Sequence, residues 1–188
     1  MDPSMDLGTL MTDRLALHPL TTAEATAVEA GDTRHPPEGA RWAPGYPDDG
    51  DRSGARRFLA ACVSTGNPQP FGPYEIRRRT DGLAIGGVAF HGRPDPAGQV
   101  TIGYGLISSA RGRGYASEAL RALLAFARSQ GVRSVKGDAD LDNIGSHRVM
   151  ASAGMRLVAV DDRLKHYRIG WSVTSRQDRE CRSDRADR

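Results

Sequence analysis

The residues whose types and spacing best support chemistry form one short run, R-G-R-G-Y-A, from Arg111 to Ala116. Its two glycines leave backbone N–H groups accessible, and its two arginines can donate hydrogen bonds to phosphate oxygens. A segment with helical apolar spacing follows at once, so the positive end of a helix dipole adds to the attraction for an anion. The run therefore predicts a phosphate site, and a diphosphate is the expected ligand.

Two familiar phosphate motifs fit the run less well. A P-loop requires a glycine followed by lysine and then a hydroxyl residue, and no glycine in the chain has those successors. The dinucleotide-binding pattern G-x-G-x-x-G is met by Gly112 and Gly114, but Ser117 takes the place of the third glycine. Three expected antiparallel strands also precede the run, where a Rossmann unit would begin its first strand. Both motifs are therefore disfavoured.

The elements on either side of the run would hold it in place. Apolar residues recur at helical spacing over 116–127, which predicts an amphipathic helix packed on a sheet. Before the run, 100–107 alternates as a strand whose second face carries only Thr101, Gly103 and Gly105. Because that face is nearly bare, an extended ligand could lie close to the backbone there.

The remaining chain alternates strand-like and helix-like segments. Strands are expected at 10–20, 74–79, 83–90, 132–139, 156–160 and 165–171, and helices at 23–30, 55–64 and 143–153. The strands between 74 and 107 would form an antiparallel meander. The strand at 132–139 follows a helical crossover and should lie parallel to the strand at 100–107. The pattern predicts a single α/β domain.

A long loop expected at 32–53 carries two large aromatic residues, Trp42 and Tyr46, among many Gly, Pro and Asp residues. Aromatic residues in such a loop either pack over a cavity or a partner, or fasten the loop to the core. The sequence leaves both interpretations open.

Composition narrows the class of protein. The chain has 188 residues, 38% hydrophobic, with a formal net charge of +3, which suits one domain and gives no sign of nucleic-acid binding. No apolar stretch approaches the roughly 18 residues of a membrane span, and Cys62 and Cys181 lack the spacing of a metal site or disulfide framework. We expect a cytoplasmic protein without metal, in which 1–9 is a flexible N-terminus and 172–188 a disordered tail.

Four blocks occur in order along the chain: T-D-R-L-A-L-H-P-L at 12–20, I-G-Y-G-L at 102–106, R-G-R-G-Y-A-S-E-A-L at 111–120 and N-I-G-S-H-R-V-M-A-S-A-G-M at 143–155. They resemble the GNAT superfamily of acetyl-CoA-dependent N-acetyltransferases, and its Rim-type branch, named for ribosomal-protein alanine acetyltransferases. The GNAT signature, Gln or Arg, two residues, Gly, one residue, then Gly or Ala, is met at 111–116. The resemblance covers 10–171 and implies an α/β (α+β) GNAT fold with a mixed, mostly antiparallel, splayed sheet of about seven strands flanked by helices.

The resemblance implies a place for each part of acetyl-CoA, the expected cosubstrate. The pyrophosphate would lie on amides from the signature run, and the pantetheine would run beside the end of the preceding strand. Asn143 and Ser146 would flank the thioester, although Asn143 is also a natural helix N-cap. The implied cofactor-binding residues are Leu106, Ile107, Arg111, Gly112, Arg113, Gly114, Tyr115, Ala116, Ser117 and Asn143.

The expected catalytic residues are Ser146, Asn143 and Asp138. Many relatives carry a tyrosine seven residues after the asparagine, thought to protonate the departing thiolate, and this chain has Met150 there. The general-acid role therefore passes to Ser146. Besides Asp138, the candidates for a base are Asp140, Glu75 and His91, and the sequence does not choose among them.

The resemblance implies direct attack of a primary amine on the thioester, in a monomer or homodimer that binds neither nucleic acid nor membrane. The acceptor would be a protein N-terminus or a small-molecule amine held by Trp42, Tyr46 and Tyr167. Met150 also leaves an alternative from another class, a non-catalytic CoA-binding sensor or partner-binding module.

Overall fold

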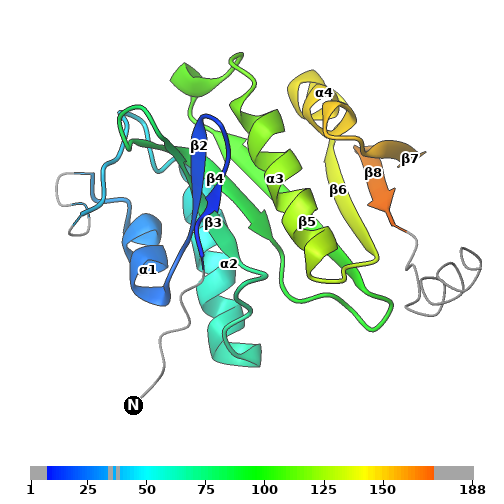
Figure 1. Ribbon diagram of the computed structural model, residues 1–188, viewed down its shortest axis with the longest axis horizontal. Coiled ribbons are helices and arrows are strands. Elements are labelled where there is room, and N and C mark those ends of the chain that lie inside the picture. The colour runs from blue at the N-terminus through cyan, green and yellow to red at the C-terminus, as the bar shows by residue number, and fades with distance from the viewer. Residues whose placement is uncertain (1–7, 34–35, 37–38, 172–188) are drawn as a thin grey trace, which may run out of the picture.

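The computed structural model describes residues 8–33, 36 and 39–171 (Figure 1). Its strands form one sheet in the order β1-β2-β3-β4-β5-β6-β8-β7. They are β1 (Leu10–Met11), β2 (Leu15–Pro19), β3 (Pro73–Arg78), β4 (Ala84–Phe90), β5 (Gln99–Leu106), β6 (Ser134–Asp140), β7 (Arg156–Val160) and β8 (Leu164–Gly170). Neighbouring strands are antiparallel except β5 and β6, which run parallel as the crossover predicted.

The described sheet has eight strands where about seven were expected, because the predicted strand at 10–20 is in fact a tight hairpin. The backbone N–H of Thr12 donates to the Leu15 carbonyl at 2.9 Å, and this turn folds β1 back onto β2. The expected flexible N-terminus and disordered tail lie outside the described residues, apart from Gly8 and Thr9.

The helices lie on both faces of the sheet (Figure 1). They are α1 (Thr22–Ala30), α2 (Asp49–Thr65), α3 (Tyr115–Ser129) and α4 (Ile144–Ser152), with a 3-10 turn at Ser108–Ala110. Asp51 of α2 lies over Gly87 of β4, whereas Phe126 of α3 has its ring 6.3 Å from that of Phe90. Because residues 87 and 90 of one strand point to opposite faces, α2 and α3 cover opposite faces. None of the described helices is long and apolar enough to cross a membrane.

The start of α2 is the largest departure from the predicted elements, since the helix begins at Asp49 and not at Ala55. Asp48 is the N-cap, and its carboxylate accepts the N–H groups of Gly50 and Asp51. Asp51 completes a reciprocal capping box by accepting the N–H of Asp48 at 3.1 Å. The glycines at 50 and 54 are weak helix formers, which hid this first turn in the sequence.

The predicted amphipathic helix is confirmed as α3, which holds the signature run against the sheet. Its buried residues, Ala119, Leu120, Leu123, Leu124 and Ala127, recur with the period of a helix. Burying each leucine contributes roughly 1.5–3 kcal/mol. The N-terminus of α3 is thereby fixed relative to the end of β5.

The sheet opens between β5 and β6. Only three register pairs join these strands, Gln99 with Ser134, Val100 with Val135 and Thr101 with Lys136. Beyond them β6 continues pairing with β8 alone, and β5 continues pairing with β4 alone. The expected splay is therefore present, and the second half of β5 has one edge without a strand partner.

Candidate functional site: two cavities that meet at β5

The signature run presents a series of free backbone donors. The N–H groups of residues 112–117 donate to no acceptor within the described part of the chain. Gly112 and Gly114 have φ values of 74° and 78°, a left-handed conformation in which glycine avoids the strain that a side chain would bring. Gly114 is the N-cap of α3 and supplies no side-chain acceptor, so the first turn of that helix keeps its donors for a ligand.

Two arginine side chains near these amides are held in place by hydrogen bonds to backbone carbonyls. The Nε of Arg111 donates to the Leu106 carbonyl at 2.9 Å, which leaves the terminal nitrogens of its guanidinium for a ligand. Arg14, from the turn after β1, donates to the Arg113 carbonyl at 2.9 Å, and its guanidinium lies 4.8 Å from the centre of the Tyr115 ring. Arg14 was not predicted for the site, because about a hundred residues separate it from the run.

A cleft of about 620 Å³ extends from the signature run along α4. It includes most of the predicted cofactor-binding residues: Leu106, Arg111, Gly112, Gly114, Tyr115, Ala116, Ser117 and Asn143. Two predicted residues do not line it, since Ile107 is 4% exposed within the core and the Arg113 side chain lies outside. On the α4 side the lining also includes Gly145, Arg148, Val149 and Ser152. These four residues are three or four positions apart, so they share one face of the helix and could have been predicted from that spacing.

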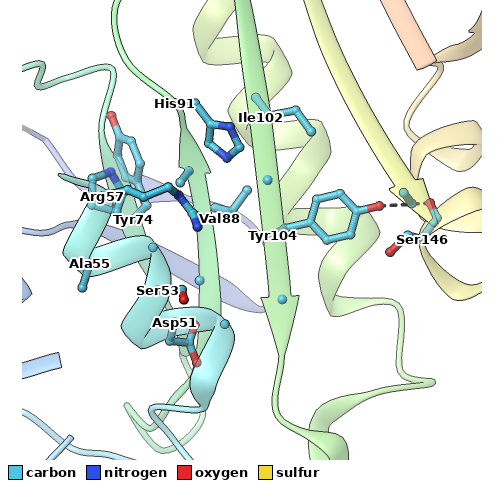
Figure 2. Close-up of a pocket in the computed structure, with 18 of the residues that line it drawn as sticks. Asp51, Ser53, Ala55, Arg57, Tyr74, Val88, His91, Ile102, Tyr104 and Ser146 are labelled. Atoms are coloured by element: carbon cyan, nitrogen blue, oxygen red, sulfur yellow. Dashed lines mark hydrogen bonds between the residues drawn. The ribbon is translucent and has the colours of Figure 1, made fainter. Parts of the chain in front are cut away.

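A second cavity, of about 460 Å³, lies between α2 and the sheet, and Figure 2 shows its lining. Its floor contains Gly87 of β4 together with Gly103 and Gly105 of β5. Gly87 and Gly105 are directly paired across the two strands. The nearly bare strand face predicted from the sequence is therefore the floor of this cavity.

The two cavities share four lining residues: Tyr104, Gly105, Asn143 and Ser146. The Tyr104 hydroxyl donates to the backbone carbonyl of Ser146 at 3.0 Å, and burial raises the pKa of Tyr104 to about 12 (Figure 2). The Asn143 side chain accepts the Ser146 N–H at 3.0 Å, so Asn143 is the N-cap of α4 as well as a lining residue. The Ser146 hydroxyl has no hydrogen-bond partner within the described residues and remains available to a ligand.

The aromatic residues predicted to hold the acceptor separate into two groups. Tyr46 is 1% exposed and contributes to the second cavity. Trp42 lines neither cavity: its backbone bridges to Ala84 and its ring meets that of Tyr46 edge-on at 5.8 Å, so it fastens the loop to the core. Tyr167 is also absent from both linings and stacks on His147 at 5.8 Å.

The candidate bases also divide by position. Asp138 and Asp140 line the second cavity and are exposed to solvent. His91 lines it too, and burial, with the nearby Arg57 charge, lowers the pKa of this histidine. Glu75 does not line it, because this 2%-exposed carboxylate is held by Arg77 at 2.5 Å and by the Tyr46 hydroxyl.

Asp51 is a functional candidate that the sequence did not indicate, since it fell in the predicted loop. It lines the second cavity from the first turn of α2. Burial, followed by the charges of Asp48 and Glu75, raises the pKa of Asp51 to about 7, although the N–H of Asp48 opposes this shift. A carboxyl group that titrates near neutrality can take up a proton under physiological conditions.

Met150 cannot substitute for the tyrosine of the relatives at that position. Its side chain is fully buried, and its sulfur would lie 3.1 Å from a Cβ placed at Gly137. The position belongs to the core beneath β6 and lines neither cavity. Among the described residues, no group of His, Cys, Asp and Glu could hold a metal ion.

The chain combines an eight-stranded open sheet, free amides at the start of α3 and a cleft beside α4. A family model described as the acetyltransferase (GNAT) domain matches residues 14–156, well over half of the chain. The chain belongs to this family, as its motifs predicted. Acetyl-CoA is the cosubstrate that the family uses.

The individual relatives share less than a third of their residues with this chain over the matched regions. The uncharacterized N-acetyltransferase YjdG of Bacillus subtilis (strain 168) is 28% identical over 111 residues, a match that spans 58% of this chain and 66% of that protein. Two solved structures share the fold: a ribosomal-protein-S5-alanine acetyltransferase from Vibrio fischeri, 15% identical with a TM-score of 0.63, and RimL, a ribosomal L7/L12 α-N-protein acetyltransferase in complex with coenzyme A, 16% identical with a TM-score of 0.62. The first comparison covers 87% of this chain and 96% of the other, the second 87% and 98%.

Proposed function

We propose that this protein transfers an acetyl group from acetyl-CoA to a primary amine by direct attack within a ternary complex. The observation that carries the proposal is the meeting of two cavities at Tyr104, Gly105, Asn143 and Ser146. One cavity leads from this junction to the free amides of the signature run, and the other opens beneath α2. Two substrates that entered from these two cavities would have their reacting ends side by side.

The residues present fit acetyl-CoA. The amides of residues 112–117 and the guanidinium groups of Arg111 and Arg148 would bind its diphosphate, a ligand that needs many donors and positive charge. When bound, acetyl-CoA supplies an activated acetyl group and a thiol leaving group. Asn143 and Ser146 would border the thioester, and the unpaired Ser146 hydroxyl is placed to donate a proton there. Holding both reactants at the junction could account for several kcal/mol of the barrier reduction.

The charge of the second cavity supports an amine acceptor. Its lining contains three carboxylates, Asp51, Asp138 and Asp140, against one guanidinium, that of Arg57. A cavity with this excess attracts cations, and amines with ordinary pKa values arrive as ammonium ions at neutral pH. The acceptor would be a protein N-terminus, since RimL is named as an α-N-protein acetyltransferase, or a small-molecule amine.

The test is thiol release from acetyl-CoA in the presence of a panel of amines: peptides that begin with alanine or serine, a polyamine and an aminoglycoside. We expect at least one acceptor to release thiol at a rate well above hydrolysis, with the same molecule blocked at its amine as the control. Tight binding of CoA with no release in any case would contradict the proposal. That result would favour the non-catalytic CoA-binding module.

A further inference from the structure

The glycine floor of the second cavity lies next to one carboxylate, that of Asp51. A Cβ at Gly87 would lie 3.1 Å from Oδ1 of Asp51, so this oxygen rests directly over the bare strand. Gly87 pairs with Gly105, which is one of the four junction residues. Paired Cα atoms of antiparallel strands lie about 4.5–5.5 Å apart, so the carboxylate is about one strand spacing from the junction.

The two oxygens of Asp51 have different surroundings. Oδ2 accepts the N–H of Asp48 at 3.1 Å, which fixes the side-chain rotamer within the capping box. No N–H group donates to Oδ1 within the described residues, and this oxygen lies over Gly87 in the cavity floor. A carboxylate fixed through one oxygen, with the other over the cavity floor, is suited to accept a proton in a defined direction.

We propose that Asp51 is the general base that removes a proton from the acceptor amine. This inference rests on the acetyltransferase function proposed above. An ammonium group at the junction loses its proton to Oδ1, and the free amine then forms a C–N bond as the C–S bond of the thioester breaks. The nitrogen gives up a second proton as the amide forms, and the sulfur takes up one proton and leaves as the thiol. Asp51 later releases the first proton to solvent, so one proton is released in each turnover.

The charged groups around Asp51 fit this assignment. Burial, and then the charges of Asp48 at the helix start and Glu75 on β3, raise the pKa of Asp51. Burial, and then the charges of Glu75 and Asp51, likewise raise the pKa of Tyr46 in the preceding loop. Arg57 lies further along α2, and His91 after β4 and Asp138 and Asp140 of β6 also line the cavity. A base that titrates near 7 is better matched to an α-amine, whose pKa is about 8, than to a lysine amine near 10.4. The assignment therefore favours α-amine acceptors.

The decisive variant is Asp51→Asn, because the asparagine oxygen can still accept the Asp48 N–H and so preserve the capping box. With a peptide acceptor that carries an α-amine, we expect kcat at pH 7 to fall about 100-fold or more. The rising limb of kcat with pH should move from near 7 to near the pKa of the acceptor amine, so that the loss shrinks at pH 9. The affinity for CoA, whose cleft Asp51 does not line, should change less than about twofold.

Two further variants serve as comparisons. Asp49 is exposed on the same helical turn and lines neither cavity, so Asp49→Asn should leave both kcat and its pH profile unchanged. Asp138→Asn tests the competing carboxylate and should keep the limb near 7. A second readout needs no activity: because the folded pKa of Asp51 is raised, the stability of the wild type should decrease from pH 4 to 7 relative to that of Asp51→Asn.

The outcomes distinguish the inference from the function on which it rests. An active enzyme whose Asp51→Asn variant shows an unchanged profile, or the same loss at every pH, would contradict the role of Asp51 alone. Removal of the limb by Asp138→Asn would assign the base to Asp138. A wild type that acetylates no amine would refute the proposed function and the role of Asp51 together.

Discussion

Gly114 is central to the proposed diphosphate site, because it both bends the signature run and caps α3. Gly114→Asp places a carboxylate among the free amides, so we expect the affinity for CoA to fall by at least about 100-fold. The left-handed φ adds a strain of about 1–2 kcal/mol. Isothermal titration with CoA measures the affinity, and urea unfolding measures the stability.

Gly131 provides the matched control for that variant. It has the same φ of 78° just beyond the other end of α3, and no atom lies within 4 Å of a Cβ built there. Gly131→Asp should therefore cost similar strain and leave CoA binding intact. If both variants lost the same affinity for CoA, strain at the ends of α3 would explain the loss, and the carboxylate added among the free amides would not.

At the scale of elements, the hairpin of β1 and β2 is joined to the first turn of α3 through Glu118. This carboxylate accepts hydrogen bonds from the Thr12 hydroxyl at 2.6 Å and from the Arg14 backbone at 2.9 Å, and its ion pair with Arg14 is 2.6 Å long. The contacts connect a segment near the start of the chain to the helix that presents the free amides. The position of the free amides at 112–117 therefore depends on Glu118 in α3 and also on Thr12 and Arg14 near the start of the domain.

Glu118→Gln should lower the free energy of unfolding at pH 7 by about 1 kcal/mol. Burial raises the pKa of Glu118, but the bonds from Thr12 and Arg14 outweigh this effect and lower it. The stabilisation is therefore complete above the unfolded pKa of about 4.3 and is lost as the pH falls through the lower folded value. Urea unfolding from pH 3 to 7 should show the difference between wild type and variant shrinking below pH 4.

The exposed pair of Arg56 and Glu29 is the control for Glu118. It joins α1 to α2 at 2.9 Å, with the arginine side chain 63% exposed, so Glu29→Gln should change stability by less than about 0.5 kcal/mol. A constant difference between wild type and Glu118→Gln across the pH range would contradict the link between that carboxylate and acid stability.

The elements also show what a sequence can reveal. The stripe on α3 and the alternation of β5 were predicted, because burial of one face produces a periodic apolar pattern in the sequence. The start of α2 was not, since a capping box built from two aspartates among glycines resembles a loop. A helix cap depends on a few specific hydrogen bonds, and the average composition of a segment does not reveal them.

One part of the candidate site could be predicted from the sequence and the other could not. The row of free amides at 112–117 could be predicted because these donors are contiguous in the chain. The second cavity could not, since Asp51, Gly87 and Gly105 come from three elements and meet only through the register of β4 with β5. Tyr167, which was predicted to hold the acceptor, stacks on His147 and does not line this cavity.

At the scale of the whole molecule, the described sheet consists of two halves, β1–β5 and β6–β8, joined by three register pairs. Acetyl-CoA in the cleft would contact β5 and α3 on one side and α4 on the other. Binding should therefore slow amide hydrogen exchange at 112–117 and at the start of α4 and leave α1 unchanged, as mass spectrometry can measure. Uniform protection across the chain, or none at 112–117, would contradict this placement.

The opening between β5 and β6 has a mechanical consequence. Along most of β5, one side of the backbone is not cross-linked to a neighbouring strand, although β5 lies at the centre of the sheet. A force that pulls the two halves apart would meet its least resistance along this line. A ligand that spans the opening would carry part of that load, so the protein should resist stretching more strongly when its cosubstrate is bound.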